Sequence, residues 1–368
     1  MKNPRLPSAL VTLAALLLFA GLCAGLVFAA AGRQIIDVAQ KLIIQVSLAN
    51  RQADLNRPMS DDQTPLRFTV AVGDTPPIIA QKLAQAGLVT DPSLFVDYVR
   101  LYGLDRQLEA GVYFLRPSQT IPQIARALTD SASSQFAFRI LEGWRLEEVA
   151  AAVDTNPYFS FTGGDFLALV GPGAPQDAAF VAYAGLPVGA SLEGFLYPET
   201  YQLPADVTPA MLRDILIQEF RSQVGEQIPL DAAAQGLSLF QVVILASITE
   251  REAVHADEQP LIAGVYRNRL AIGMRLEADP TVQYGIGYRD GSWWPKITAA
   301  DYRTAISPYN TYLNDGLPPG PIASPGIEAI RAVVYPTPSN YYYFRADCRT
   351  DGYHDFAVTF QEHLANGC

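Results

Sequence analysis

From Ser8 to Ala31 the chain carries no charged side chain, and this stretch constrains the rest of the molecule. Its roughly 24 residues, dominated by Ala, Leu and Val, can span a hydrocarbon core as a helix that rises about 1.5 Å per residue. Two basic residues precede the stretch, and basic residues favour the cytoplasmic side of a membrane. We therefore expect a cytoplasmic tail at 1–9, a single-pass transmembrane helix at 10–31 in the cell membrane, and an extracytoplasmic remainder.

A cleaved signal peptide is the alternative to this anchor, because Ala29, Ala30 and Ala31 have the small side chains of a cleavage site. The uncharged run is longer than the apolar region of a typical signal peptide, so the uncleaved anchor is favoured. The compartment beyond the membrane permits disulfides. Cys348 and Cys368 either pair there or remain as thiols, and the sequence leaves both interpretations open.

Composition and charge restrict the class of ligand. The chain is 49% hydrophobic and 17% charged, as is typical of globular or membrane-attached proteins. Its net charge of −11 repels a polyanion, so we expect no nucleic-acid partner. The three histidines are scattered and the sequence has no phosphate-cradling glycine loop, so we expect neither a metal nor another cofactor. An uncharged or cationic ligand fits this composition better.

The hydrophobic pattern divides the extracytoplasmic part into three segments. Residues 32–65 are predicted to form a juxtamembrane helix and a polar linker. Residues 66–134 alternate short strands with helices, which predicts a small α+β module. Residues 135–368 are predicted to form a larger α+β domain, with a proline- and glycine-rich loop at 307–326. A long loop rich in Tyr, Asn and Pro usually shapes a site.

The small module has a strand-turn-helix pattern around Gly73, Asp74 and Thr75. This pattern resembles a LysM module, a carbohydrate-binding fold that recognises N-acetylglucosamine polymers. The resemblance implies sugar binding close to the membrane. A structural spacer without sugar contact is the alternative.

A carboxylate ends the most apolar helix that the pattern predicts, at residues 238–253. Leu239, Val243, Ala246 and Glu250 follow one another at intervals of four, three and four, so they lie on one stripe of the helix. Burial disfavours the charged form of a carboxyl group and raises its pKa. A general acid needs such a pKa to hold its proton at working pH, so Glu250 is the candidate proton donor.

Glu252 is predicted to project toward the more polar side of the same helix, so Glu250 is expected to be the more desolvated of the two. A structural role for Glu250 is the alternative, either as a solvated carboxylate or in an ion pair with Arg251, Arg267 or Arg269.

Glycosidic cleavage is a common use of an extracytoplasmic acid of this kind. Ordinary glycosidases use two carboxyl groups, one as the acid and one as the base or nucleophile. Glu193, Glu199, Glu252 and Asp279 are candidates for the second group. Sequence alone places none of them opposite Glu250.

Four longer motifs indicate which type of glycosidic cleavage to expect. In order after the apolar segment they are LEGFLYPETYQLP, ASITERE, VYRNRLAIGMRLEADPTVQYG and SPYNTYLNDGLPPGPIASPG. Over residues 66–368 the chain resembles the endolytic murein transglycosylase family, also called YceG-like. The resemblance implies a peptidoglycan lyase that cuts the β-1,4 bond between N-acetylmuramic acid and N-acetylglucosamine and leaves a 1,6-anhydro end. The family's catalytic glutamate falls on Glu250, which acts alone because the substrate's C6 hydroxyl attacks the anomeric carbon.

Further substrate contacts are carried over from the motifs, because their polar groups and rings suit sugar recognition. These candidates are Glu193, Tyr197, Glu252, Asp279, Tyr284, Tyr309, Asn310 and Thr311. A turn hydrogen bond or a packed aromatic ring is the alternative for each. Trp293 and Trp294 either extend a sugar-stacking surface or pack back onto the domain.

The membrane anchor and the resemblance together predict where the enzyme acts. An enzyme held at the membrane reaches newly made glycan, so we expect it to cleave nascent strands and end their elongation, with peptidoglycan synthases as partners. A non-catalytic peptidoglycan-binding scaffold is the alternative from another class, and a muramidase-type hydrolase is a third. Their products differ: anhydro ends, none, or reducing ends.

Overall fold

The computed structural model describes residues 38–130, 134–349 and 351–367. The transmembrane helix predicted at 10–31 lies outside these residues. Within the described ranges, no single helix is long and apolar enough to cross a membrane.

Two consecutive helices do meet the length and composition of a span when taken together. They are α10 (Gln227–Ala234) and α11 (Leu239–Glu252), and a bend of 96° separates them. From Leu239 to Thr249 the side chains of α11 are buried apart from Gln241, as in the core helix of a folded domain.

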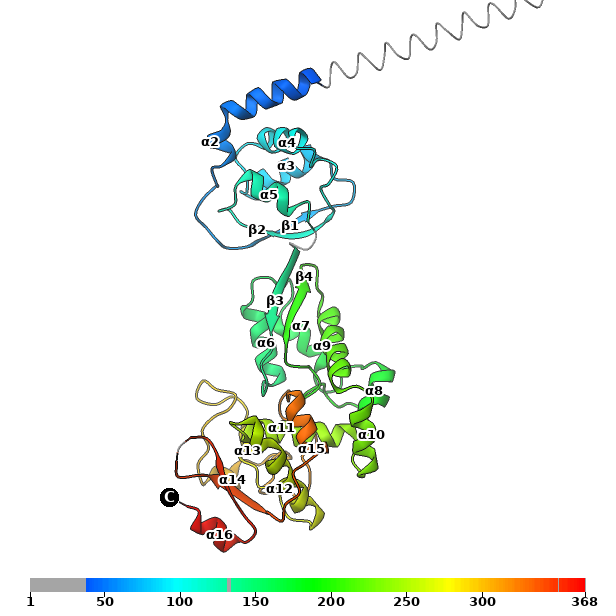
Figure 1. The fold of residues 1–368 in the computed structure, drawn as a ribbon, viewed down its shortest axis with the longest axis vertical. Helices are drawn as coiled ribbons and strands as arrows, with labels where there is room; N and C mark the ends of the chain where they lie inside the picture. Colours follow the sequence, from blue (N-terminus) through cyan, green and yellow to red (C-terminus); the bar gives the residue numbers. More distant parts are fainter. Residues whose placement is uncertain (1–37, 131–133, 350, 368) are drawn as a thin grey trace, which may run out of the picture. The chain divides into compact units, whose positions relative to one another are not determined.

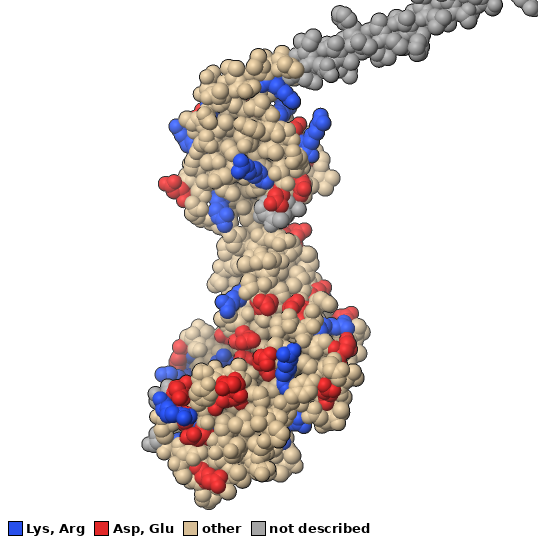
Figure 2. Space-filling model, in the orientation of Figure 1, with Lys and Arg blue, Asp and Glu red and all other residues tan. Residues whose placement is uncertain are grey.

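The chain divides into two compact units between Ser134 and Gln135. The first unit combines helices with one small antiparallel sheet and the second with two (Figure 1), so the predicted α+β class is confirmed. On the face shown in Figure 2, acidic and basic side chains are interspersed over the second unit.

The first unit has a two-stranded sheet of β1 (Leu66–Val70) and β2 (Gly111–Leu115). The strands are antiparallel, and Phe68 stands opposite Tyr113. Side chains alternate along β1, because Phe68 and Val70 are buried while their neighbours are exposed. The buried face packs into the core of this unit.

Two helices connect these strands, α3 (Pro76–Gln85) and α4 (Pro92–Leu101). Each begins with a proline, which fits the first turn because a backbone N–H is not needed there. Three further helical segments complete the unit: residues 38–50, α2 (Gln52–Leu55) and α5 (Ile121–Ala127).

The second unit is larger and mostly helical. Its other elements are β3 (Gln135–Arg139), α6 (Leu146–Thr155), α7 (Gly163–Val170), α8 (Ala178–Ala184), β4 (Thr200–Pro204), α9 (Pro209–Val224), η2 (Ala256–Glu258), α12 (Gln259–Ala271), α13 (Asp279–Ile286), α14 (Asp301–Thr304), α15 (Ile327–Val334), β5 (Tyr343–Ala346), β6 (His354–Ala357) and α16 (Phe360–Ala365). β3 pairs with β4, and β5 pairs with β6, both antiparallel. Close to β5, Cys348 is disulfide-bonded, and its partner lies outside the described residues.

α11 lies at the centre of this unit, in contact with α10, α12, α13 and α15 (Figure 1). A capping box starts it: Ser238 Oγ accepts the N–H of Gln241 at 3.2 Å, and Gln241 Oε1 accepts the N–H of Ser238 at 2.9 Å. The flanking helices remove its apolar side chains from water, which stabilises the unit.

The proline-rich segment at 307–326 is irregular, as predicted, and it lies against α11. Ile322 donates its N–H to Ser247 Oγ at 3.0 Å. The turn at Gly194 meets the same segment: a Cβ at this glycine would lie 2.5 Å from Pro321 Cβ and 2.8 Å from Val243 Cγ1. Gly194 also has φ of +83°, which disfavours any L side chain. A glycine therefore lets the loop approach the central helix.

Gly194→Ala is expected to destabilise the second unit because it adds a clash to the backbone cost. The left-handed conformation costs about 1–2 kcal/mol for alanine, and overpacking adds about 1–3 kcal/mol. Gly189→Ala is the matched control, since its φ is +78° and its Cβ would meet nothing within 4 Å. Thermal unfolding of both variants measures the difference. Equal unfolding midpoints would show that the loop relaxes around the added methyl group.

Candidate active site

The last turn of α11 carries two carboxyl groups into the protein, Glu250 and Glu252. Two residues correspond to a rotation of about 200°, so the side chains leave opposite sides of the helix. Burial raises the pKa of each to about 7. Glu252 faces a polar side, as expected, since the pocket there is lined by charged and polar side chains from α12, α13 and β5. The expectation that Glu250 is the more desolvated of the two is wrong, because burial raises the pKa of Glu252 as far as that of Glu250. The predicted desolvation of Glu250 is confirmed.

Glu250 has few hydrogen-bond donors around it. Its Oε2 accepts the backbone N–H of Gly326 at 3.2 Å, directly before α15. Burial raises its pKa most and the negative charge of Glu142 raises it further, while Gly326, Arg251 and the Gln259 side chain act in the opposite direction. A carboxyl group with a pKa near neutrality can hold a proton and release it.

The ion pair between Glu250 and an arginine, which was the structural alternative, is not observed, because each candidate arginine binds elsewhere. The guanidinium of Arg251 lies over the ring of Trp294, 3.9 Å from its centre. Arg267 donates to Gln235 Oε1 at 2.5 Å, and Arg269 donates to two backbone carbonyls at 2.6 Å. In the described part of the chain, no basic group lies within 4 Å of the Glu250 carboxylate.

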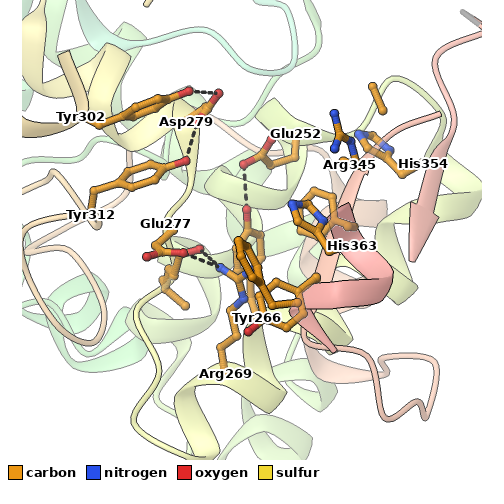
Figure 3. Close-up of a pocket in the computed structure, with 15 residues that line it drawn as sticks. Glu252, Tyr266, Arg269, Glu277, Asp279, Tyr302, Tyr312, Arg345, His354 and His363 are labelled. Carbon is orange, nitrogen blue, oxygen red and sulfur yellow. Dashed lines mark hydrogen bonds and ion pairs between the residues drawn. The ribbon is translucent and has the colours of Figure 1, made fainter. Parts of the chain in front are cut away.

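Glu252 faces a pocket of about 480 Å³ (Figure 3). Its Oε1 accepts the hydroxyl of Tyr266, on α12, at 2.7 Å. The wall combines carboxylates, basic groups and aromatic rings: Glu252, Tyr266, Arg269, Leu276, Glu277, Asp279, Tyr302, Tyr312, Tyr343, Phe344, Arg345, Ala346, His354, Phe360 and His363. Such a mixture of acceptors and ring faces suits a sugar, whose hydroxyls need partners and whose C–H faces stack on rings.

Asp279, the first residue of α13, is held in the same pocket by two tyrosines. Its carboxylate accepts the hydroxyl of Tyr312 at 2.7 Å and that of Tyr302 at 3.2 Å. The rings of these tyrosines lie 4.4 Å apart. Burial raises the pKa of both phenols, with Asp279 adding to the shift, so both remain donors at neutral pH.

Glu193 belongs to a separate buried cluster with Tyr284 and Tyr309. It is 1% exposed, and it accepts the N–H of Leu146 at 3.2 Å and the hydroxyl of Tyr284 at 3.2 Å. The ring of Tyr309 lies 4.6 Å from that of Tyr284. Burial raises the pKa of Glu193 to about 8, and the charge of Glu147 contributes. The structure thus joins three predicted site residues beside the start of α6.

The sequence did not point to Arg145, which is 4% exposed and covers this cluster. Its guanidinium lies 4.0 Å from the ring centre of Tyr284 and 4.9 Å from that of Trp293. Trp294 donates its Nε1–H to Glu148 at 2.9 Å. Of the two interpretations of the tryptophan pair, packing back onto the domain is the one observed.

Three other predicted contact residues are enclosed by protein. Asn310 donates to the carbonyls of Tyr302 and Ala305 at 3.1 and 2.9 Å. Thr311 Oγ1 accepts the backbone N–H of Ala278, the residue before α13, at 3.0 Å. Tyr197 is 6% exposed. Asn310 and Thr311 therefore hold the turn that presents Tyr312 and the helix start that presents Asp279, rather than facing the pocket themselves.

The sequence also did not point to Tyr266 or Tyr312 as pocket residues. Tyr312 stands in the same SPYNTY motif as the residues that were named, and this proximity was the available signal. Tyr266 has no local signal, because only the packing of α12 on α11 brings it to Glu252. Across the described residues, no group of three or more His, Cys, Asp or Glu is arranged to hold a metal ion.

The sequence and fold of this chain are similar to those of known proteins. The model of the YceG-like family matches residues 68–367. The endolytic murein transglycosylase of Bacillus subtilis is 29% identical over 314 residues, which cover 82% of this chain and 84% of that protein. A Streptococcus pneumoniae protein of the same name is also 29% identical, over 78% of this chain and 55% of its own length. The crystal structure of a YceG-like protein from Listeria monocytogenes aligns with a TM-score of 0.54 and 29% identity, over 82% of this chain and 98% of that one.

The buried carboxyl of Glu193 predicts a pH dependence of stability. Its native pKa of about 8 exceeds that of an exposed glutamate, so the native state binds more protons and stability falls as pH rises between the two values. Each pH unit between them corresponds to about 1.4 kcal/mol. We expect Glu193→Gln to reduce the fall in the unfolding midpoint of the second unit between pH 5 and 8.5. Equal slopes for variant and parent would assign the dependence to other groups.

Proposed function

Because this chain belongs to the YceG-like family, we propose that it is an endolytic lytic transglycosylase that cleaves peptidoglycan glycan strands. The proposed bond is the β-1,4 link from N-acetylmuramic acid to N-acetylglucosamine, and the product carries a 1,6-anhydro-muramic end. The observation that carries this proposal is Glu250. Glu250 is the first glutamate of the ASITERE motif, and burial raises its pKa to about 7.

The reaction needs one group that gives and then takes a proton. Neutral Glu250 protonates the glycosidic oxygen as the bond to the anomeric carbon breaks, which forms the free 4-hydroxyl of N-acetylglucosamine. The C6 hydroxyl of the muramic acid attacks the anomeric carbon, and the Glu250 carboxylate takes the hydroxyl proton. No water is consumed, and Glu250 ends protonated as it began. Its pKa near 7 suits both steps.

We infer that the tyrosine-lined pocket beside Glu252 holds sugar units of the strand away from the cleaved bond, because Glu250 leaves the opposite side of α11 and does not line this pocket. Tyr302 and Tyr312 offer ring faces, and Asp279 and Glu252 offer acceptors for sugar hydroxyl and amide groups (Figure 3). Asn310 and Thr311 support this wall from inside. Glu193, Tyr284, Tyr309 and Tyr197 act as supports of the surrounding loops rather than as direct contacts.

Glu252 is a rival for the acid, and a specific observation favours it. It has a raised pKa like that of Glu250, and its side chain lines a pocket rich in tyrosines and polar groups. Against this role, its Oε1 is already bound by Tyr266, and it stands at the second glutamate of the motif. Separate neutralisation of the two groups decides between them.

Membrane anchoring is part of the proposal. The uncharged stretch from Ser8 to Ala31 supports it. The described helix at 38–50, which follows this stretch, leaves Leu42 and Ile43 60% and 69% exposed. Apolar side chains next to an anchor fit the boundary of a bilayer. An anchored enzyme reaches nascent strands, so release or termination of these strands, with peptidoglycan synthases as partners, follows as the proposed role.

The first unit is proposed to bind glycan as a LysM-like module. The order of its elements, β1, α3, α4 and β2, and the antiparallel pairing of its strands support this comparison. If the first unit binds glycan, it would retain the glycan strand for cleavage by the second unit.

The products of isolated glycan strands test the proposed reaction. The parent protein is expected to generate anhydromuramic ends, Glu250→Gln to reduce their formation by at least about a hundredfold, and Glu252→Gln to retain most of it. Mass spectrometry of the strands, with circular dichroism to confirm folding, measures this. Reducing ends would indicate a hydrolase, and strands that are bound but intact in every sample would indicate a scaffold. Loss of activity in Glu252→Gln alone would move the acid to that residue.

The proposed anchor predicts that the full chain stays in the membrane fraction after alkaline carbonate extraction, because a spanning helix is held by its apolar surface. Charged substitutions at Leu16 and Leu17 are expected to prevent this retention. Release of the parent chain, shortened at its N-terminus, would instead indicate a cleaved signal peptide.

A further inference from the structure

Glu142 stands in a short turn between β3 and α6 that the structure holds firmly against the segment before α15. Gly143 donates its N–H to the carbonyl of Ser324 at 2.8 Å, and Ser324 donates to the carbonyl of Trp144 at 2.7 Å. Arg251 Nη1 also donates to the carbonyl of Gly143 at 3.5 Å. The paired backbone bonds fix the turn to the segment before α15, although the residues are nearly two hundred positions apart, and Arg251 links the turn to the end of α11.

Glu142 and Glu250 both reach Gly326. Glu250 accepts its N–H at 3.2 Å. A Cβ built on Gly326 would lie 2.1 Å from Glu142 Oε1 and 2.7 Å from its Cδ, so the Glu142 carboxylate already occupies the space of a side chain. The two carboxyl groups are thus neighbours across one glycine, at a distance where like charges interact strongly.

The two groups differ in exposure. Glu142 is exposed, and it lines an open cavity of about 500 Å³ with Arg139, Pro198 and Glu199. Glu250 lies deeper and is largely desolvated. Burial therefore disfavours the charged form of Glu250, and the nearby negative charge of Glu142 disfavours it further.

The charges that act on Glu250 are those of Glu142, in the turn before α6, and Arg251, on α11. Of the helices packed on α11, α15 carries Glu328, which pairs with Arg331 at 3.3 Å, and α12 carries Arg267 and Arg269, which bind elsewhere. Of these, Glu142 makes contact with the glycine that binds Glu250.

We propose that the ionised Glu142 carboxylate, held against Gly326, keeps the proton on Glu250 at neutral pH and so sets the upper pH limit of the reaction. Glu142 is a positioning residue, because it acts through Glu250. This inference rests on the proposed function for its effect on rate. Its effect on the proton of Glu250 stands apart from that function.

The pH dependence of kcat/KM on glycan strands, with the full chain in detergent micelles, tests the proposal. Removal of the negative charge in Glu142→Gln lowers the pKa of Glu250, so the alkaline limb of the profile moves to lower pH. A displacement of about one pH unit reduces activity about tenfold at pH 8 and leaves it unchanged at pH 5. Glu328→Gln removes the same charge without contact with Gly326, and we expect its limb to stay in place.

Other profiles would overturn the proposal. A loss in Glu142→Gln that is equal at every pH would show a purely structural role. An equal displacement in Glu142→Gln and Glu328→Gln would show a general effect of net charge rather than of this contact.

A direct titration separates this inference from the proposed function. The Glu250 carboxyl carbon, labelled with ¹³C and identified by its absence in Glu250→Gln, is expected to titrate near pH 7 in the parent and at lower pH in Glu142→Gln. An unchanged midpoint would overturn the inference even if Glu250 is the acid. A displaced midpoint, in a protein whose Glu250→Gln variant keeps full activity, would support the inference and overturn the assignment of the acid.

Discussion

Enclosure of α11 is the constraint on which the rest of the second unit depends. Nearly every side chain from Leu239 to Thr249 is buried, and at least five other helices contact this one. A helix surrounded in this way carries the residues of its last turn into the interior. Here those residues are Glu250 and Glu252, so two carboxyl groups enter a region where water stabilises their charge poorly. Their affinity for protons is thus a consequence of how a core helix packs.

The helical rotation then gives the two groups different surroundings. Glu250 lies beside a backbone N–H and a second carboxylate. It therefore has few hydrogen-bond donors, and the nearby negative charge favours its neutral form. Glu252 meets a tyrosine hydroxyl and a pocket rich in rings. One helix end therefore presents a proton donor on one side and a wall suited to sugars on the other. In the proposed reaction these tasks are complementary, because cleavage requires a held strand and a neutral acid.

The irregular segment at 307–326 connects both sides. It contributes Tyr312 to the pocket, Ile322 to the surface of α11, and Gly326 to Glu250. Asn310, one of its polar side chains, holds a turn by donating hydrogen bonds to the carbonyls of Tyr302 and Ala305. An irregular segment can contact three places in this way. Its backbone N–H and C=O groups form hydrogen bonds with side chains and loops, so they do not have to pair within a helix or with a neighbouring strand.

Local patterns in the sequence determined the elements. The apolar spacing predicted a helix at 238–253, observed as α11, and the short apolar stretch GVYFL is β2, because such patterns depend on neighbours along the chain. The desolvation of Glu250 followed from the same spacing. Only the tertiary structure decided what each carboxyl meets. Tyr266 reaches Glu252 through the packing of α12, and Glu142 reaches Gly326 across nearly two hundred positions. Helical geometry specifies the direction of a side chain, whereas the groups that await it there come from segments whose placement no local pattern encodes.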